Sequence, residues 1–352
     1  MIDKNVVILR GGNLNTFLKV PGLFCLYFDN EKLKRTKIHS NDVPLFMEIE
    51  YSEEDFAKEK YVFHGHSFDP QKGKLEVDHT QKSKAPIDFL KIEFVNRKRT
   101  EIMMLLSVFT DKYLFHYPQI QGWFLEFQLD NVEKLESKYG QLFYSYSFTE
   151  EDKSPESLNS INNEEYFCNP TVLTVRNVDT GMLLNNVSIS DMFRYYYKGP
   201  TLVKEAVRNA ARLYYQSQNH FDVDLATEFV YLIIALESLI QVEYDGLKIT
   251  HCGTCKQPIF AVSKKFHAFL EKYYNDYNKA EINKIYSLRS SIVHRGFNIV
   301  DPSIFLFEDS LKEKEKLYKN EGLIRMTRYI TKSVINKFLF YNREGIIAPN
   351  KT

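Results

Sequence analysis

Several features that would assign a protein to a familiar class are scarce or absent in this sequence of 352 residues. Its four cysteines are too few for the disulfide framework of a secreted domain, so we expect a reducing cytoplasm. The longest apolar run, residues 229–236, ends at Glu237 and falls short of the roughly 20 residues that a membrane helix needs. Residues 1–10 lack the basic segment and apolar core of a secretory signal, so we expect neither secretion nor a membrane partner.

The sequence also lacks a glycine-rich phosphate loop, a nucleophile elbow and a dinucleotide-binding fingerprint, which excludes three large classes of enzyme. A composition of 44% hydrophobic and 26% charged residues excludes a disordered chain, a collagen-like chain and a coiled coil. The length is comfortable for two domains.

The 46 basic and 46 acidic residues balance over the whole chain but not within its halves. Residues 191–352 hold 24 basic and 18 acidic residues, whereas residues 1–190 hold 22 and 28. We therefore expect any anionic ligand to bind the second half, although this imbalance of charge is too modest to identify a nucleic-acid-binding protein.

The first half, residues 1–190, has the pattern of a β-rich domain. Short aromatic or β-branched runs, several of them alternating apolar and polar residues, are separated by glycine and proline turns. About ten such runs predict a sandwich or a strongly bent antiparallel sheet, with a polar loop over residues 149–165. The predicted strands cover residues 6–9, 23–28, 43–50, 60–63, 74–77, 89–95, 123–129, 142–148 and 172–175.

The second half, residues 191–345, has the pattern of a helical bundle, so the fold class is α+β. The stripe of apolar residues over 201–215 predicts an amphipathic helix. Asp222 and Asp224 are placed to cap a second helix that ends near residue 242 and is apolar on most sides, which is typical of the centre of a domain. Further helices are predicted over residues 263–277, 279–294 and 323–339.

One short polar run inside an apolar helix, residues 285–296, could carry chemistry. It contains Arg289 and His294, a pair suited to RNA cleavage without a metal. Histidine can accept the proton of a ribose 2′-hydroxyl, and arginine can donate hydrogen bonds to the phosphate as negative charge develops. On spacing alone, the pair is better explained as an arginine bonded to a carbonyl or carboxylate and a histidine that caps the last helical turn.

Helix geometry restricts how Arg289 and His294 can cooperate. Five residues along an ideal helix turn through about 500°, which leaves the two positions about 140° apart. Both can face one substrate only where the helix ends or bends between them, or where a second subunit completes the cleft. Gly296 favours a helix end close by.

The helical half resembles the HEPN superfamily, and within it the Apea-like branch. Residues 288–296 are similar to the family's Arg-x4-His box, and residues 235–240 are similar to the aliphatic-Glu-aliphatic helix that precedes the box by about 50 residues. The resemblance covers residues 195–340. It implies a metal-independent endoribonuclease that needs no catalytic cofactor, binds RNA and places Arg289 and His294 at the cleft of a homodimer. Such proteins are commonly toxins or anti-phage effectors, and the β-rich domain would sense a regulatory or phage-derived partner.

Three further residues take roles from this resemblance. Arg295 is either a phosphate contact or a solvated charge at the helix end. Ser290 occupies the position where many nuclease members have Asn, Asp or His, so it is compatible with the branch but removes a polar helper. Glu237 either orients Arg289 or satisfies a backbone group or a tyrosine hydroxyl.

Because Ser290 differs from the Asn, Asp or His that many nuclease members have at this position, a second function stays open. The same domain could be a non-catalytic RNA-binding or dimerisation module, as in an adaptor or an immunity partner. It could also be the modified partner of a nucleotidyltransferase.

The spacing of Cys252 and Cys255, directly after His251, resembles half of a zinc knuckle. A structural zinc site needs four ligands, which His251 and His267 or a second protomer could complete. The alternatives are a turn with two free thiols or, less in keeping with the lack of a βαβ pattern, a redox disulfide.

His64 and His66 are alternate residues of a predicted strand and could share one metal ion. No third ligand stands at a matching spacing in the sequence, because Asp69 and His79 are explained by turns. We therefore interpret the pair as part of a polar strand edge.

Overall fold

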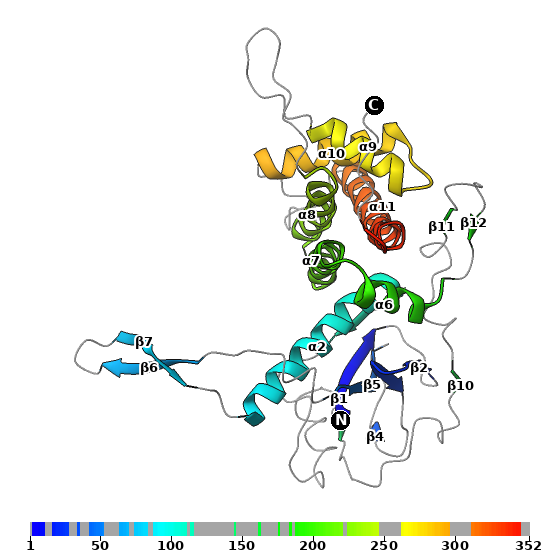
Figure 1. The fold of residues 1–352 in the computed structure, drawn as a ribbon. Coiled ribbons are helices and arrows are strands. Elements are labelled where there is room, and N and C mark those ends of the chain that lie inside the picture. Colours follow the sequence, from blue (N-terminus) through cyan, green and yellow to red (C-terminus); the bar gives the residue numbers. More distant parts are fainter. Residues whose placement is uncertain are drawn as a thin grey trace. The chain divides into compact units, whose positions relative to one another are not determined.

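The computed structural model has an α+β fold, with a small sheet near the N-terminus and a larger helical part, as the sequence predicts (Figure 1). The chain forms two compact units, Met1–Met103 with Phe115–Asn162, and Met104–Leu114 with Asn163–Thr352. The structure describes residues 2–10, 16–27, 34–35, 42–52, 63–69, 74–83, 87–110, 113–115, 144–145, 161–162, 175–176, 183–184, 187–220, 224–245, 262–295 and 311–345.

The main sheet has the strand order β10-β2-β3-β5-β1-β8. The long strands β1 and β5 pair antiparallel over their whole length, from Ile2↔Glu50 to Arg10↔Asp42. Strand β3 is buried at all four positions, which explains its unbroken apolar sequence. The strands are β1 (Ile2–Arg10), β2 (Thr16–Val20), β3 (Phe24–Tyr27), β5 (Asp42–Glu50), β8 (Tyr113–Phe115) and β10 (Ile161–Asn162).

Six shorter or separate strands form two-stranded ladders outside this sheet. The predicted strand over residues 123–129 and most of the predicted loop over residues 149–165 lie outside the described residues. The ladders pair β4 (Lys34–Arg35) with β9 (Tyr144–Ser145), β6 (Phe63–Asp69) with β7 (Lys74–Ser83), and β11 (Val175–Arg176) with β12 (Leu183–Leu184).

The extent of β7 corrects one prediction. Asp69 is the last residue of β6, in keeping with the predicted turn. His79 lies inside β7, so a turn does not explain it. The sequence could not show this, because the length of a strand depends on the partner with which it pairs.

The prediction of a strand over residues 89–95 is wrong, because this segment opens the helix α2 (Ile87–Phe109). Its alternation of apolar and charged residues would place Ile92 and Phe94 on one face of a strand. In the structure Ile92 is 58% exposed, whereas Phe94 and its neighbour Val95 are buried. Two adjacent buried residues, followed by buried Ile102, match a helical period that a seven-residue window is too short to reveal.

The last turns of α2 belong to the second unit. The side-chain Nδ2 of Asn336 donates a 2.9 Å hydrogen bond to the carbonyl oxygen of Val108, close to the C-terminal end of α2. Such terminal carbonyls have no partner within their own helix, so Asn336 caps α2 from a distant part of the chain. Phe109 packs edge-on against Phe193 beside this cap.

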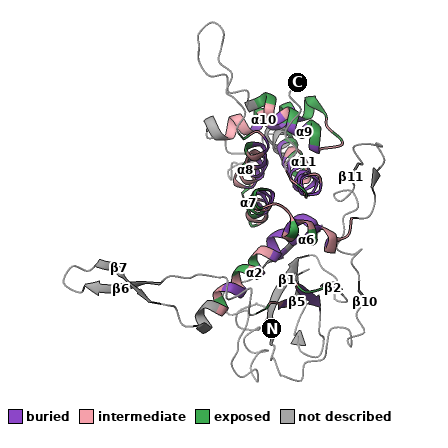
Figure 2. Cartoon of the chain, in the orientation of Figure 1, coloured by how far each residue is buried: buried purple, intermediate pink, exposed green. Residues whose placement is uncertain are grey.

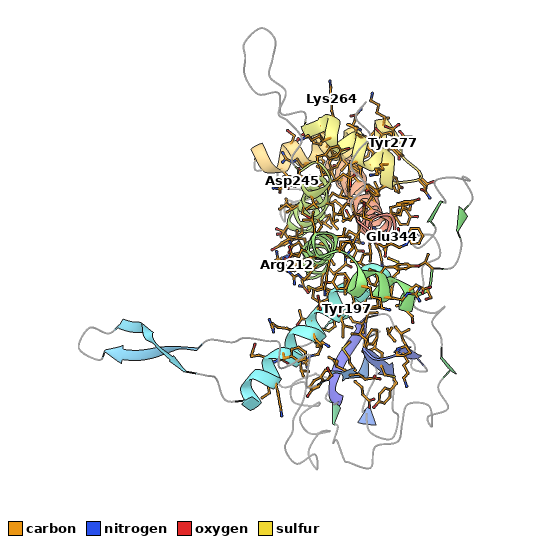
Figure 3. The ribbon with its side chains drawn as sticks, in the orientation of Figure 1. Tyr197, Arg212, Asp245, Lys264, Tyr277 and Glu344 are labelled. Atoms are coloured by element: carbon orange, nitrogen blue, oxygen red, sulfur yellow. The ribbon has the colours of Figure 1, made fainter. Side chains whose placement is uncertain are left out.

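The second unit is a bundle in which α8 packs against α7, α9, α10 and α11, so that their side chains interleave (Figure 3). Asp224 caps α8 as predicted, because its Oδ1 accepts a 3.0 Å hydrogen bond from the backbone N–H of Thr227. The helices are α6 (Ile189–Lys198), α7 (Thr201–Gln218), α8 (Leu225–Glu243), α9 (Val262–Tyr273), α10 (Lys279–Arg295) and α11 (Leu311–Tyr341).

Helix α8 is long and apolar enough to cross a membrane by length and composition alone, with a mean hydropathy of 1.7. The core helix of a bundle meets the same criterion, and Figure 2 shows buried residues along α7, α8 and α11. The predicted central position of this helix accounts for its composition. Its apolar sequence is interrupted by Glu228 and Glu243, whose side chains are fully buried in the bundle.

Both buried glutamates are matched by hydrogen-bond donors from other helices. Glu228 Oε1 accepts from Nε and Nη2 of Arg328 on α11, at 2.7 and 2.5 Å. Glu243 lies 2.5 Å from Lys272 Nζ and accepts a 2.9 Å hydrogen bond from the Tyr273 hydroxyl. Burial raises the pKa of Tyr273 well above its usual value, so the phenol stays protonated and donates to Glu243.

We expect Tyr273→Phe to lower the free energy of unfolding by about 1–3 kcal/mol, because it removes a hydrogen bond from two buried groups. The Tyr273 hydroxyl donates to Glu243 and accepts a 2.9 Å hydrogen bond from Asn342 Nδ2. Chemical denaturation followed by far-UV circular dichroism measures the change. Tyr318→Phe is the control, because Tyr318 is 69% exposed. Equal stability of the two variants would contradict a role for the Tyr273 hydroxyl.

Candidate functional site

Glu237 of α8 and Arg289 of α10 form an ion pair although 52 residues separate them in the sequence. Both Nε and Nη2 of Arg289 lie 3.2 Å from Glu237 Oε1. The side chains are 21% exposed for Arg289 and 29% exposed for Glu237, so the pair lies at the surface of the bundle rather than in its core. The sequence offers either Arg289, or a backbone group or tyrosine hydroxyl, as the partner of Glu237. The structure shows the contact with Arg289.

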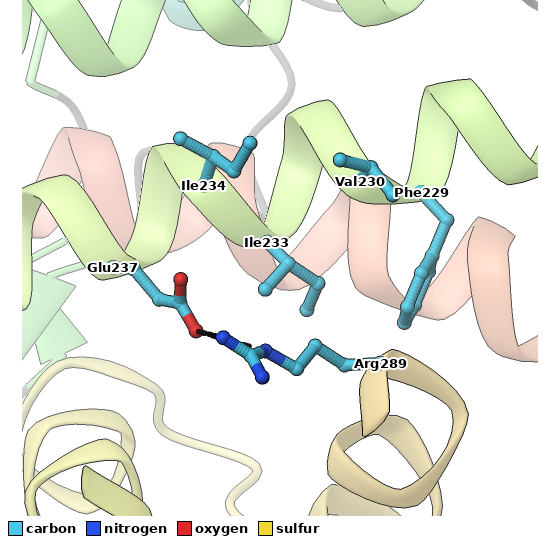
Figure 4. A pocket seen from close by; sticks show the side chains of 6 residues that line it. All are labelled: Phe229, Val230, Ile233, Ile234, Glu237 and Arg289. Atoms are coloured by element: carbon cyan, nitrogen blue, oxygen red, sulfur yellow. Dashed lines mark hydrogen bonds and ion pairs between the residues drawn. The ribbon is translucent and has the colours of Figure 1, made fainter. Parts of the chain in front are cut away.

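The ion pair closes one end of an apolar pocket of about 270 Å³ (Figure 4). The pocket is lined by Arg289 and by five residues of α8 at helical spacing, namely Phe229, Val230, Ile233, Ile234 and Glu237. Ile234 is 42% exposed and so adds apolar surface beside the pocket. Apolar residues therefore continue around α8 beyond the face that the bundle covers.

The pairing with Glu237 uses one edge of the guanidinium group. A guanidinium presents five N–H donors in a planar fork and can bind two oxygen groups through different edges. Glu237 contacts the edge that contains Nε, and Figure 4 shows the remaining nitrogen turned away from the carboxylate. The same carboxylate partly neutralises the charge that Arg289 would present to an anion.

Helix α10 begins at Lys279, as the sequence predicts, and has no end between Arg289 and His294. It continues without interruption to Arg295, so Gly296 follows both residues instead of separating them. The two positions are then about 140° apart around one continuous helix. Within a single protomer they do not share a face of α10.

The other residues predicted for this site are described less fully. Ser290 is half-buried on α10, next to Arg289. The backbone positions of His294 and Arg295 are in the last turn of α10, and their side chains lie outside the described part of the chain.

The proposed zinc ligands His251, Cys252 and Cys255 lie outside the described residues. His267, the other candidate, has its Nδ1 atom 2.8 Å from the Tyr277 hydroxyl. Among the residues whose side chains the structure describes, no three His, Cys, Asp or Glu residues are grouped to hold a metal ion. Structural zinc at this pair of cysteines therefore stays a prediction.

Sequence reasoning missed the apolar wall of the pocket, in particular Ile234. The clue was present, since α8 has more apolar residues than a single buried face requires. A central position of α8 in the domain explains these extra apolar residues equally well, so the sequence alone does not reveal the pocket.

Comparison with protein-family models, with curated proteins and with solved structures finds no match to this chain. The resemblance to the HEPN superfamily therefore depends on two short segments. These two segments contain Glu237 and Arg289, which are in contact.

We expect Arg289→Met to change the free energy of unfolding by about 1 kcal/mol or less, because ion pairs between partly exposed side chains contribute little. Arg328→Met is the matched variant, since it removes the cation that faces buried Glu228, and it should cost about 3–5 kcal/mol. Chemical denaturation of both proteins tests the contrast. A loss for Arg289→Met as large as that for Arg328→Met would make the Arg289–Glu237 pair a structural element rather than a site.

Proposed function

We propose that this protein is a metal-independent endoribonuclease of the HEPN type, acting as a toxin or an anti-phage effector in the cytoplasm. The observation that supports the proposal is the contact between Glu237 and Arg289, which joins the two segments that resemble the superfamily. The β-rich first half, a sandwich or a bent sheet, would regulate the helical half by sensing a partner.

The proposed reaction is an attack of the ribose 2′-oxygen on the adjacent phosphorus. His294 accepts the proton of the 2′-hydroxyl, and Arg289 donates hydrogen bonds to the non-bridging oxygens as their charge increases. The bond from phosphorus to the 5′-oxygen breaks, and an imidazolium returns a proton to that oxygen. The products are a 2′,3′-cyclic phosphate and a 5′-hydroxyl, with no metal and no redox change.

We propose further that each cleft takes Arg289 from one protomer and His294 from its partner. The continuous helix α10 separates the two positions by about 140°, so one copy does not present both to one phosphate. A twofold axis near this surface would bring Arg289 of one protomer opposite the partner's His294. Ile234 and the pocket beside Arg289 offer apolar area that such a dimer would bury.

The purified wild type should cleave RNA in the presence of EDTA, and Arg289→Ala or His294→Ala should reduce the rate by about 10²–10⁴-fold. Gel analysis of a labelled RNA, with end-group analysis for the cyclic phosphate, measures both rate and product. Arg325→Ala is the control, because Arg325 is 66% exposed and also pairs with a glutamate, Glu321. Cleavage that depends on added metal, or equal rates for Arg289→Ala and Arg325→Ala, would refute the proposed mechanism.

Mixing the two inactive variants tests the shared cleft. In an Arg289→Ala and His294→Ala heterodimer, one of the two clefts contains both native residues, so an equilibrated equimolar mixture should regain about one quarter of the wild-type rate. Sites built within one protomer would regain nothing. Mixing either single variant with the double variant Arg289→Ala/His294→Ala is the control, since no cleft then contains both groups.

The non-catalytic alternative has its own supporting observation, because Glu237 partly neutralises Arg289 and so weakens its attraction for phosphate. In that case the helical half binds RNA or forms dimers without cleavage. An inactive wild type whose RNA affinity equals that of the Arg289→Ala/His294→Ala variant would favour this function.

A further inference from the structure

The pocket beside Arg289 combines an apolar wall with one polar end (Figure 4). Of the four apolar residues that line it, Phe229 and Ile233 are almost fully buried. Val230 is half-buried and Ile234 is exposed, so these two side chains offer apolar surface to a ligand. A molecule that binds here would therefore place an apolar face against α8 and a polar group at the ion pair.

The polar end of the pocket presents a hydrogen-bond acceptor beside the donors of Arg289. Glu237 Oε1 lies 3.2 Å from both Nε and Nη2 of Arg289, and Figure 4 shows the other carboxylate oxygen turned away from the guanidinium. No side chain or backbone group in the described part of the chain donates to this second oxygen. Because a carboxylate accepts hydrogen bonds and donates none, the pocket favours a ligand whose edge carries an N–H group.

The size of the pocket restricts the ligand further. Its volume of about 270 Å³ is close to the lower limit of the roughly 300–1,000 Å³ that small-molecule sites occupy, so it suits a single flat ring system rather than a whole nucleotide. A nucleobase has two apolar faces and an edge of N–H and C=O groups. Proteins recognise unpaired RNA by covering those faces and hydrogen-bonding to that edge.

We propose that this pocket binds the base of an unpaired nucleotide next to the scissile phosphate, and that Glu237 selects cytosine over uracil. The proposal rests on RNA being the substrate of the proposed nuclease. The free carboxylate oxygen accepts a hydrogen bond from the N4 amino group of cytosine. Uracil carries a carbonyl oxygen in the same place, so two acceptors would face each other and the hydrogen bond would be lost. In a duplex this edge is paired, so the site takes single-stranded RNA.

Glu237 then contacts two groups through its two oxygens. One oxygen orients Arg289, which would bind the phosphate, and the other contacts the base. A single side chain thus fixes the base and the phosphate-binding group relative to each other, which is the positioning that cleavage at one bond requires. The proposed dimer would enclose the pocket within its cleft and shield this hydrogen bond from water.

The test uses 2′-O-methyl RNA oligonucleotides that carry one unmodified ribonucleotide, so that cleavage can occur at one bond only. The base on each side of that bond is cytosine or uracil, and cleavage is measured in EDTA. At one of these two positions, we expect the wild type to cleave the cytosine substrate about 10-fold faster than the matched uracil substrate.

Glu237→Gln should invert this preference. The amide oxygen of glutamine can still accept from Arg289, whereas its amide nitrogen donates to the uracil carbonyl and opposes the cytosine amino group. Glu321→Gln is the matched control, because Glu321 also pairs with an arginine and is 26% exposed, and it should keep the wild-type preference. A glutamate that only held Arg289 in place would change the rates for both bases alike. Circular dichroism verifies that both variants are folded.

Equal rates of the wild type on the two bases, or an unchanged preference in Glu237→Gln, would overturn the assignment. Where a protein does not cleave, its affinity for fully 2′-O-methylated oligonucleotides of the same sequences gives the preference, and equal or absent binding counts against the site in the same way. A wild type that binds cytosine better but cleaves neither RNA would refute the nuclease and support the base pocket. Cleavage without a base preference would do the reverse.

Discussion

Helix α8 imposes the constraint on which the bundle depends, because it places three glutamates in an otherwise apolar sequence and provides no cation of its own. Each glutamate meets a cation from a different helix: Glu228 pairs with Arg328 of α11, Glu237 with Arg289 of α10, and Glu243 with Lys272 of α9. An apolar helix alone could slide or rotate against its neighbours at small cost. A buried carboxylate that loses its partner is costly, so the pairs of Glu228 and Glu243 specify the register of α11 and α9 against α8.

The three pairs differ in exposure. Glu228 and Glu243 are fully buried, and their partners close the interior of the bundle. The Arg289–Glu237 pair is partly exposed beside an apolar pocket. A glutamate of α8 paired with a cation of another helix thus also holds Arg289 in place at the surface of the bundle. A carboxylate there keeps a long side chain in one orientation, although it also reduces the net charge.

The sequence correctly predicts those features of the fold that depend on residues close together in the chain. The apolar stripe of α7 and the Asp224 cap of α8 follow from spacings of a few residues, and both are present. The strand predicted at residues 89–95 failed because a short alternating run fits two periods, and the packing of α2 decides between them. For the candidate site, the sequence identified Glu237 and Arg289 but left their contact as one of several interpretations. The turn predicted at His79 is wrong, because the length of β7 depends on its pairing with β6, which spacing does not show.

The uninterrupted course of α10 has a consequence for control of the proposed nuclease. A cleft completed within one protomer would be active whenever the chain is folded. In the proposed dimer a lone protomer would hold two half-sites, because the positions of Arg289 and His294 are about 140° apart on one helix. Glu237 pairs with Arg289 in one of them. Activity then depends on the concentration and geometry of the dimer, since both half-sites must meet across the interface. Under this proposal a monomer would be inactive, and a partner that changes the association of two copies would control cleavage without touching the RNA.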